Sequence, residues 1–98
     1  MYLRINQIRF DPPRERLVRR FVEEHILPAV RQLPGFRRYT IAGDLTAGRG
    51  ILVSDWDDRD QAQALPSAMA YLAEGVVRLG VEIEPGTVYE VLVHAQAV

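Results

Sequence analysis

The apolar residues of this chain follow two periods, one typical of strands and one typical of helices. Residues 2–10 alternate as an extended segment, and residues 36–42 and 49–56 form two more on either side of a turn at 43–48. In residues 87 to about 94, apolar side chains again fall on both faces of an extended segment. The pattern therefore predicts four strands.

Two other segments show the helical period. Residues 14–33 carry one broad apolar stripe, and Pro28 inside it predicts a kink because it removes one helical hydrogen bond. Residues 57–80 repeat apolar side chains at helical spacing. In this second helix Asp57 is expected to be the N-cap, and Pro66 is expected to split the helix into a short and a longer part.

The order of these segments, β-α-β-β-α-β, is that of a ferredoxin-like α+β protomer with an antiparallel sheet. The 98 residues make one domain, residues 1–98. The strands are apolar on both faces, and the two helices can cover one of them. Because the other face would leave an exposed apolar patch, we predict that a second copy covers it and that the protein is a homodimer.

Composition narrows the classes of function. With a formal net charge of -1 and no basic stripe, the chain is not expected to bind nucleic acid. No apolar run approaches the ~18 residues of a membrane span, and no signal-peptide core is visible, so a cytoplasmic protein without a membrane partner is expected. The chain has no Cys, and helix capping accounts for the acidic residues at 55–60, so neither a metal nor a cofactor is predicted.

Three stretches resemble a known group. The sequences Leu33–Arg37 (LPGFR), Gly48–Asp57 (GRGILVSDWD) and Val88–Leu92 (VYEVL) are similar to the antibiotic biosynthesis monooxygenase-like group of the dimeric α+β barrel superfamily. The resemblance implies that two ferredoxin-like sheets pack face to face as a dimeric α/β barrel, with a ligand pocket between the sheet and the helices of each protomer. Members include cofactor-free monooxygenases of aromatic polyketides, haem-degrading enzymes, isomerases and proteins with no assigned reaction.

The resemblance carries over few site residues. Trp56 matches a Trp near the substrate of the polyketide monooxygenases, but Leu52 and Ala62 stand where those enzymes have Asn and Tyr. Asn6 matches a strand-one Asn of the haem-degrading members, whereas Ala64 stands near the position of their helical Trp, and the second helix has no His. The chain is therefore predicted neither to degrade haem nor to oxidise anthrone-type substrates.

His25 is the candidate catalytic residue on physical grounds. It lies four residues after Phe21 and four before Ala29, so helical spacing places it in the apolar stripe and predicts that it points inward. A buried His can act as a proton carrier near neutral pH. The alternative is a core His that is hydrogen-bonded to a backbone carbonyl, for example one freed by Pro28.

Three more residues are candidates for contact with a substrate. Asn6 lies mid-strand, where its amide either lines a pocket or pairs with a neighbouring side chain or water. Trp56 ends the third predicted strand, where it either contacts substrate or fills the gap between sheet and helix. Tyr39 is expected at the pocket rim or the dimer interface, together with Arg4, Arg37 and Arg38.

The leading functional prediction is binding of a small apolar or aromatic molecule in the pocket between sheet and helices. Cofactor-independent oxygenation would follow if His25 removes a proton while Asn6 and Trp56 orient the substrate, whose anion then reacts with oxygen. The alternative is a non-enzymatic dimeric binding or stress-related module, so the sequence leaves open whether the chain is an enzyme. An open cavity with an unpaired polar group favours the first prediction, and a closed apolar core favours the second.

Overall fold

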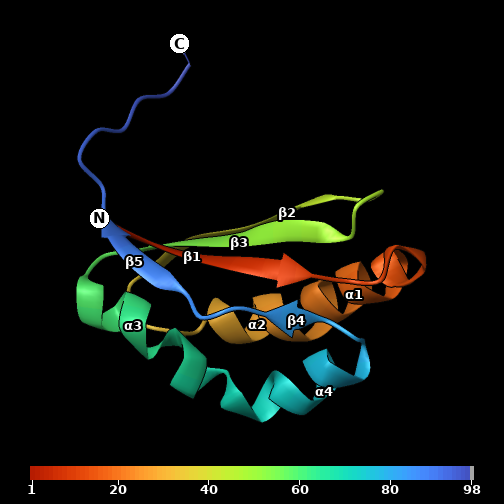
Figure 1. Ribbon diagram of the computed structural model, residues 1–98. Helices are drawn as coiled ribbons and strands as arrows, with labels where there is room; N and C mark the ends of the chain where they lie inside the picture. Colours follow the sequence, from red (N-terminus) through yellow and green to blue (C-terminus); the bar gives the residue numbers. More distant parts are fainter. Residues whose placement is uncertain (98) are drawn as a thin grey trace.

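One antiparallel sheet carries helices on a single face (Figure 1). The computed structural model describes residues 1–97. The strands are β1 Tyr2–Arg9, β2 Phe36–Asp44, β3 Arg49–Trp56, β4 Glu82–Ile83 and β5 Thr87–Glu90, and the α-helices are α1 Glu15–Phe21, α2 Leu27–Val30, α3 Arg59–Ala68 and α4 Ala73–Arg78. Short 3-10 turns lie at Pro12–Arg14 and Ala70–Leu72, and a π turn lies at Val22–Ile26. The predicted ferredoxin-like order is confirmed.

The central strands are β1 and β3, which pair along the whole length of β1. β2 pairs with the outer edge of β3, while β4 and β5 both pair with the other edge of β1. The last predicted strand is shorter than expected, because β5 ends at Glu90 and residues 91–97 extend away from the body (Figure 1). Leu92 and Val93 in this segment are each 88% exposed, so nothing in the described chain covers them.

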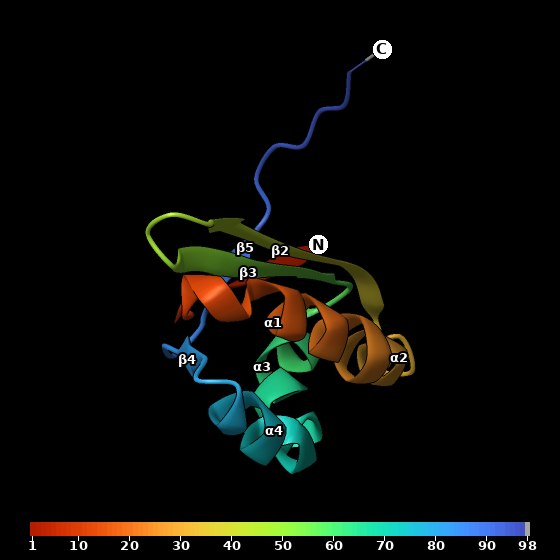
Figure 2. The same ribbon diagram turned by 90° about the vertical axis from the view of Figure 1, so that its right-hand side faces the viewer.

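Side chains of β1 alternate between a covered face and an open face of the sheet. Arg4, Asn6 and Ile8 point toward the helices and are buried, whereas Leu3 and Ile5 point to the opposite face. Figure 2 shows α1 passing directly beneath β2 and β3. The helices therefore cover one face, as predicted, and leave the other to solvent.

The first helical segment bends where Pro28 lies. Pro28 has no N–H to donate to the carbonyl of Glu24, and its ring crowds that carbonyl. Instead, the N–H of Leu27 donates to the oxygen of Val22, five residues back, which closes the π turn between α1 and α2. The predicted kink thus takes the form of one widened turn, and residues after it are rotated relative to a continuous α-helix.

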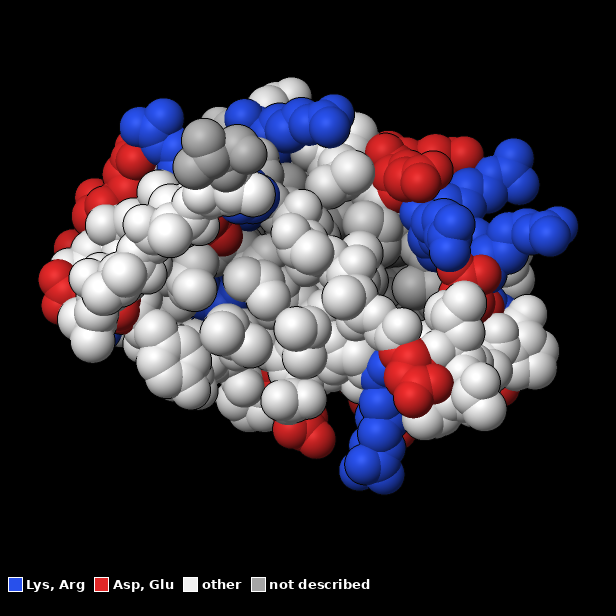
Figure 3. Space-filling view, turned by 90° about the horizontal axis from the view of Figure 1, so that it is seen from above, with Lys and Arg blue, Asp and Glu red and all other residues white. Residues whose placement is uncertain are grey.

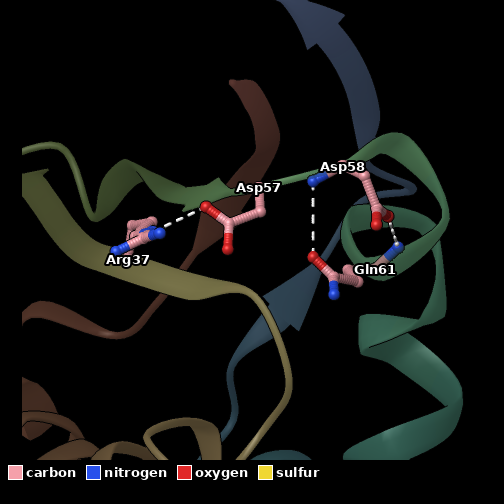
Figure 4. Close-up of polar contacts among 4 residues, drawn as sticks. All are labelled: Arg37, Asp57, Asp58 and Gln61. Carbon is pink, nitrogen blue, oxygen red and sulfur yellow. Dashed lines mark hydrogen bonds and ion pairs between the residues drawn. The ribbon is translucent and has the colours of Figure 1, made fainter.

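The second helical segment differs from the prediction at Asp57 and at Pro66. Asp58, not Asp57, is the N-cap of α3: its carboxylate accepts from the Gln61 N–H at 2.9 Å, and the Gln61 amide oxygen accepts from the Asp58 N–H at 3.3 Å (Figure 4). Asp57 instead pairs with Arg37, with 2.6 Å between Nε and Oδ1. The helix continues through Pro66 to Ala68, and the break comes at the 3-10 turn that follows.

The apolar core lies between α2, the end of β3 and α3. Val30, Trp56 and Ala62 are 0–1% exposed, and partly buried residues of both helical segments pack around them. None of the helices within residues 1–97 is long and apolar enough to cross a membrane.

Candidate functional site

A cavity of about 350 Å³ lies between α1 and the part of the sheet formed by β1 and β2, and it is open to solvent on one side. The first helical segment supplies one wall and β2 with its following turn supplies the other. The lining residues are Ile8, Phe10, Glu15, Val18, Arg19, Val22, Glu23, Leu27, Tyr39, Ile41, Ala42, Gly43 and Leu45. Most of this wall is apolar, which is typical of small-molecule sites.

One of the lining residues on β2 is a glycine, Gly43, which lies on the covered face of the sheet. At Gly43 an added Cβ would stand 3.1 Å from the Phe10 ring, so this glycine lets the ring pack against the strand. A second hollow of about 40 Å³, deeper between α1, α4 and the sheet, shares Val22 and Tyr39 with the cavity.

Tyr39 is the polar residue within this apolar wall. Burial raises the pKa of its hydroxyl to about 12, so the hydroxyl stays protonated at neutral pH. Every fully buried polar side-chain atom among residues 1–97 has a hydrogen-bond partner, and none of the side-chain hydrogen bonds found there involves Tyr39. Because Tyr39 lines both hollows, its hydroxyl can donate a hydrogen bond to a molecule there.

Charged groups lie at the α1 side of the cavity. Glu15 and Arg19 form an i,i+4 ion pair, and Glu23 stands one turn further along. Two carboxylates against one guanidinium make this side slightly acidic, which disfavours an anionic ligand. Among residues 1–97, no group of three or more His, Cys, Asp or Glu side chains is arranged to hold a metal ion.

Asn6 and Trp56 do not line the cavity. The Asn6 amide donates to the carbonyl of Glu84 at 2.9 Å and so ties β1 to the segment after β4. Trp56 is 1% exposed, donates from Nε1 to the Ser54 hydroxyl at 2.8 Å, and packs edge-on against Phe36 at 5.6 Å between ring centroids. The interpretation of Trp56 as a core filler fits these contacts, whereas the partner of Asn6 is a backbone carbonyl and not the side chain or water that was expected.

His25 points outward, so its predicted inward orientation is wrong. It is exposed, and its ring lies 5.0 Å from that of Phe21. The reason is the π turn, which contains His25 and breaks the α-helical phase on which the prediction depended. Of the four candidate residues, only Tyr39 lines the cavity, and the predicted meeting of His25, Asn6 and Trp56 in one cavity does not occur.

Two features escaped sequence reasoning. Val22 and Leu27 lie five positions apart, a spacing that does not indicate a shared α-helical face, yet both line the cavity. Arg4, expected at a rim or interface, is 9% exposed, and its Nη1 donates to the Ala62 carbonyl at 3.4 Å. Burial lowers the pKa of Arg4. A proline inside each helical segment was the available signal, since Pro28 lies just after the π turn and Pro66 frees the Ala62 carbonyl.

Comparison with known proteins places the fold. No protein-family model matches the chain, and no curated protein matches it. Among solved structures, a proposed antibiotic biosynthesis monooxygenase from Deinococcus radiodurans is 19% identical, with 100% of this chain and 99% of that chain covered and a TM-score of 0.76. A dimeric ferredoxin-like protein from an uncultured marine organism is 14% identical, with 98% of each chain covered and a TM-score of 0.73.

A third structure carries a ligand. The monooxygenase of the gene ActVA-Orf6 from Streptomyces coelicolor, solved in complex with nanaomycin D, is 13% identical, with 99% of this chain and 90% of that chain covered and a TM-score of 0.70. Antibiotic biosynthesis monooxygenase-like proteins thus share the fold of this chain, as the resemblance implies. At these identities the likeness establishes the fold and not the reaction.

Proposed function

We propose that this chain binds a small, neutral and largely apolar molecule in the cavity between α1 and the sheet. The observation that carries the proposal is an open volume of about 350 Å³ whose largely apolar wall includes Tyr39. Such a volume lies at the lower end of the roughly 300–1,000 Å³ of ligand sites. An open cavity with an unpaired polar group also favours ligand binding over a module whose pocket is filled by side chains.

The wall indicates the chemistry of the ligand. Apolar side chains favour an aromatic or aliphatic body, and a neutral hydroxyl favours a ligand with a hydrogen-bond acceptor such as a carbonyl. The excess carboxylate at the α1 side disfavours a ligand that carries its own negative charge. A neutral aromatic ketone of one to two rings therefore suits the cavity.

Oxygenation without a cofactor is the second candidate function, because the fold is shared with a monooxygenase bound to nanaomycin D. That reaction needs a base to form the substrate anion. Tyr39 stays protonated, so the carboxylates in the lining, Glu15 and Glu23, are the groups proposed for that role. Haem degradation and anthrone oxidation remain predicted to be absent. Leu52 and Ala62 replace polar groups of the polyketide monooxygenases, and Ala64 stands near the position of the helical Trp of the haem-degrading members.

A homodimer through the open face of the sheet is part of this proposal. Seen from that side, the centre of the molecule is uncharged and its charged side chains gather toward the edges (Figure 3). Ile51 is 37% and Tyr89 52% exposed, although both belong to strands. A second copy packed on this face would bury them, and one structural neighbour is described as dimeric.

The test is an NMR titration of the protein with 1-acetylnaphthalene, compared with 1-ethylnaphthalene, which lacks the carbonyl. We expect shift changes at Val22, Tyr39 and Gly43, and roughly fivefold tighter binding of the ketone, as one hydrogen bond contributes about 1 kcal/mol. Tyr39→Phe should abolish the preference, while the matched control Tyr89→Phe should keep it. Shift changes confined to the open face, or no binding of either compound, would contradict the proposal.

A further inference from the structure

We infer that Pro28 is a positioning residue that builds the inner wall of the cavity through the π turn; the inference rests on the proposed function of that cavity. Pro28 itself is exposed and is not among the lining residues. The two residues that close the adjoining π turn, however, do line the cavity. The N–H of Leu27, immediately before Pro28, donates to Val22, and both side chains line the cavity.

The π turn explains how these two side chains share one wall. In an α-helix five residues cover about 1.4 turns, so Val22 and Leu27 would point in widely different directions. A hydrogen bond to the fifth preceding residue widens the turn, and five residues then complete close to one turn. The same rotation carries His25, inside the turn, to the exposed surface.

The other helical proline shows that a proline does not by itself produce this wall. Pro66 lies inside α3, which continues to Ala68 with α-helical geometry. The carbonyl that Pro66 leaves free, that of Ala62, accepts from Arg4 at 3.4 Å. Pro66 is not among the lining residues of either hollow. It is therefore a control for Pro28, in a helix of the same chain.

Pro28→Ala restores the missing N–H and removes the ring from the carbonyl of Glu24. The segment can then close as a continuous α-helix, which turns Leu27 away from Val22 and takes one apolar contact out of the wall. Loss of such a contact should weaken binding of 1-acetylnaphthalene about tenfold. The melting temperature should stay equal or rise, because Ala is a better helix former than Pro. Weaker binding in an equally stable protein separates positioning from general support of the fold.

The experiment compares wild type, Pro28→Ala and Pro66→Ala for melting temperature, for binding of 1-acetylnaphthalene and for its preference over the one-ring ketone acetophenone. We expect Pro28→Ala to lose affinity and to discriminate less between the two ketones, and Pro66→Ala to bind like wild type. Pro28→Leu, which restores the same N–H, repeats the test.

The proposal is overturned if Pro28→Ala and Pro28→Leu bind like wild type, or if Pro66→Ala weakens binding equally. It is also overturned if the Pro28 variants do not fold, since Pro28 would then serve the fold. If wild type itself binds neither ketone, the proposed function and this inference fail together, an outcome distinct from the others.

Discussion

The two faces of the sheet carry similar apolar strands but differ in what covers them. On the covered face, Ile8 and Trp56 are 4% and 1% exposed because helices of the same chain pack on them. On the open face, Ile51 and Tyr89 remain 37% and 52% exposed. The covered face thus depends on the chain alone, whereas we propose that the open face depends on a second molecule. Substitutions on the first should change stability or ligand binding, and substitutions on the second should change assembly.

The covered face also contains two buried polar side chains, and each of them is hydrogen-bonded. Asn6 and Arg4 are both 9% exposed, and each donates to a backbone carbonyl, that of Glu84 or Ala62. Burial of polar groups is costly unless they are hydrogen-bonded. These two residues therefore belong to the structural frame. The Tyr39 hydroxyl, for which no such partner is found among residues 1–97, belongs to the cavity.

The largest expected effect is on the covered face at Trp56. Trp56→Ala should lower the free energy of unfolding by about 3–5 kcal/mol, because it leaves a cavity in a core that is closed to solvent. Urea unfolding measures this. The control Tyr71→Ala removes an aromatic side chain that is 69% exposed and should cost far less. Equal costs at the two positions would contradict the assignment of Trp56 to the core.

On the open face, Val53→Asp should separate the proposed homodimer. Val53 pairs with Ile5 at the centre of the sheet, where a carboxylate would be buried between two copies. The chain is 11.1 kDa, so the sedimentation mass should fall from about twice that value to the monomer value. The matched control Val77→Asp changes a residue of α4 that is already 71% exposed and should leave the dimer intact. A monomeric wild type at micromolar concentration would contradict the prediction.

Gly86→Ala probes the covered face at Arg4. An added Cβ would stand 2.7 Å from Nη2 and 2.8 Å from Cζ of Arg4, so the guanidinium must move from its place beside Ala62. The expected loss of stability is about 1–3 kcal/mol, typical of overpacking. In an Arg4→Ala background the same substitution should cost less, because the obstacle is gone. An identical cost in both backgrounds would show that the backbone at Gly86, not Arg4, is responsible.

The last prediction concerns pH at Tyr39. Burial raises its pKa to about 12 from 10.0, so the folded chain keeps a proton that the unfolded chain loses. The unfolded state binds fewer protons in this window, and stability therefore falls as the pH rises from about 10 to 12, by roughly 2 kcal/mol. Tyr39→Phe should lack this loss, and Tyr89→Phe should retain it. Unfolding curves at pH 9 and 11 make the comparison.

Local sequence signals predicted the elements well. The third strand occupies residues 49–56 as expected, because a turn that ends at Gly48 precedes it and a helix cap follows it within a few residues. The predicted N-cap was one residue too early. Asp57 and Asp58 are chemically equivalent as caps, but Asp57 forms an ion pair with Arg37, and Asp58 accepts from the Gln61 N–H. A local pattern thus located this helix start to within a residue, whereas the last predicted strand ends at Glu90, about four residues early.

The candidate site was predicted less well, for reasons that lie beyond local pattern. His25 had the right spacing for an ideal helix, but the π turn before Pro28 changed its direction. Trp56 had the right residue type for a ligand contact, but it is 1% exposed and forms one buried cluster with Val30 and Ala62. Whether a side chain on the covered face meets a void or a neighbour depends on the volumes of residues distant in sequence.

What the sequence determined by itself is the order of strands and helices, the ferredoxin-like pairing that this order allows, and two strand faces that both need cover. Periodicity and turn residues act over a few positions, so they are readable without the fold. Only the tertiary structure decided that the space beside Trp56 is filled and the space beside Tyr39 is hollow. That difference arises from how α1 and α3 sit on one sheet, and packing of distant segments sets it.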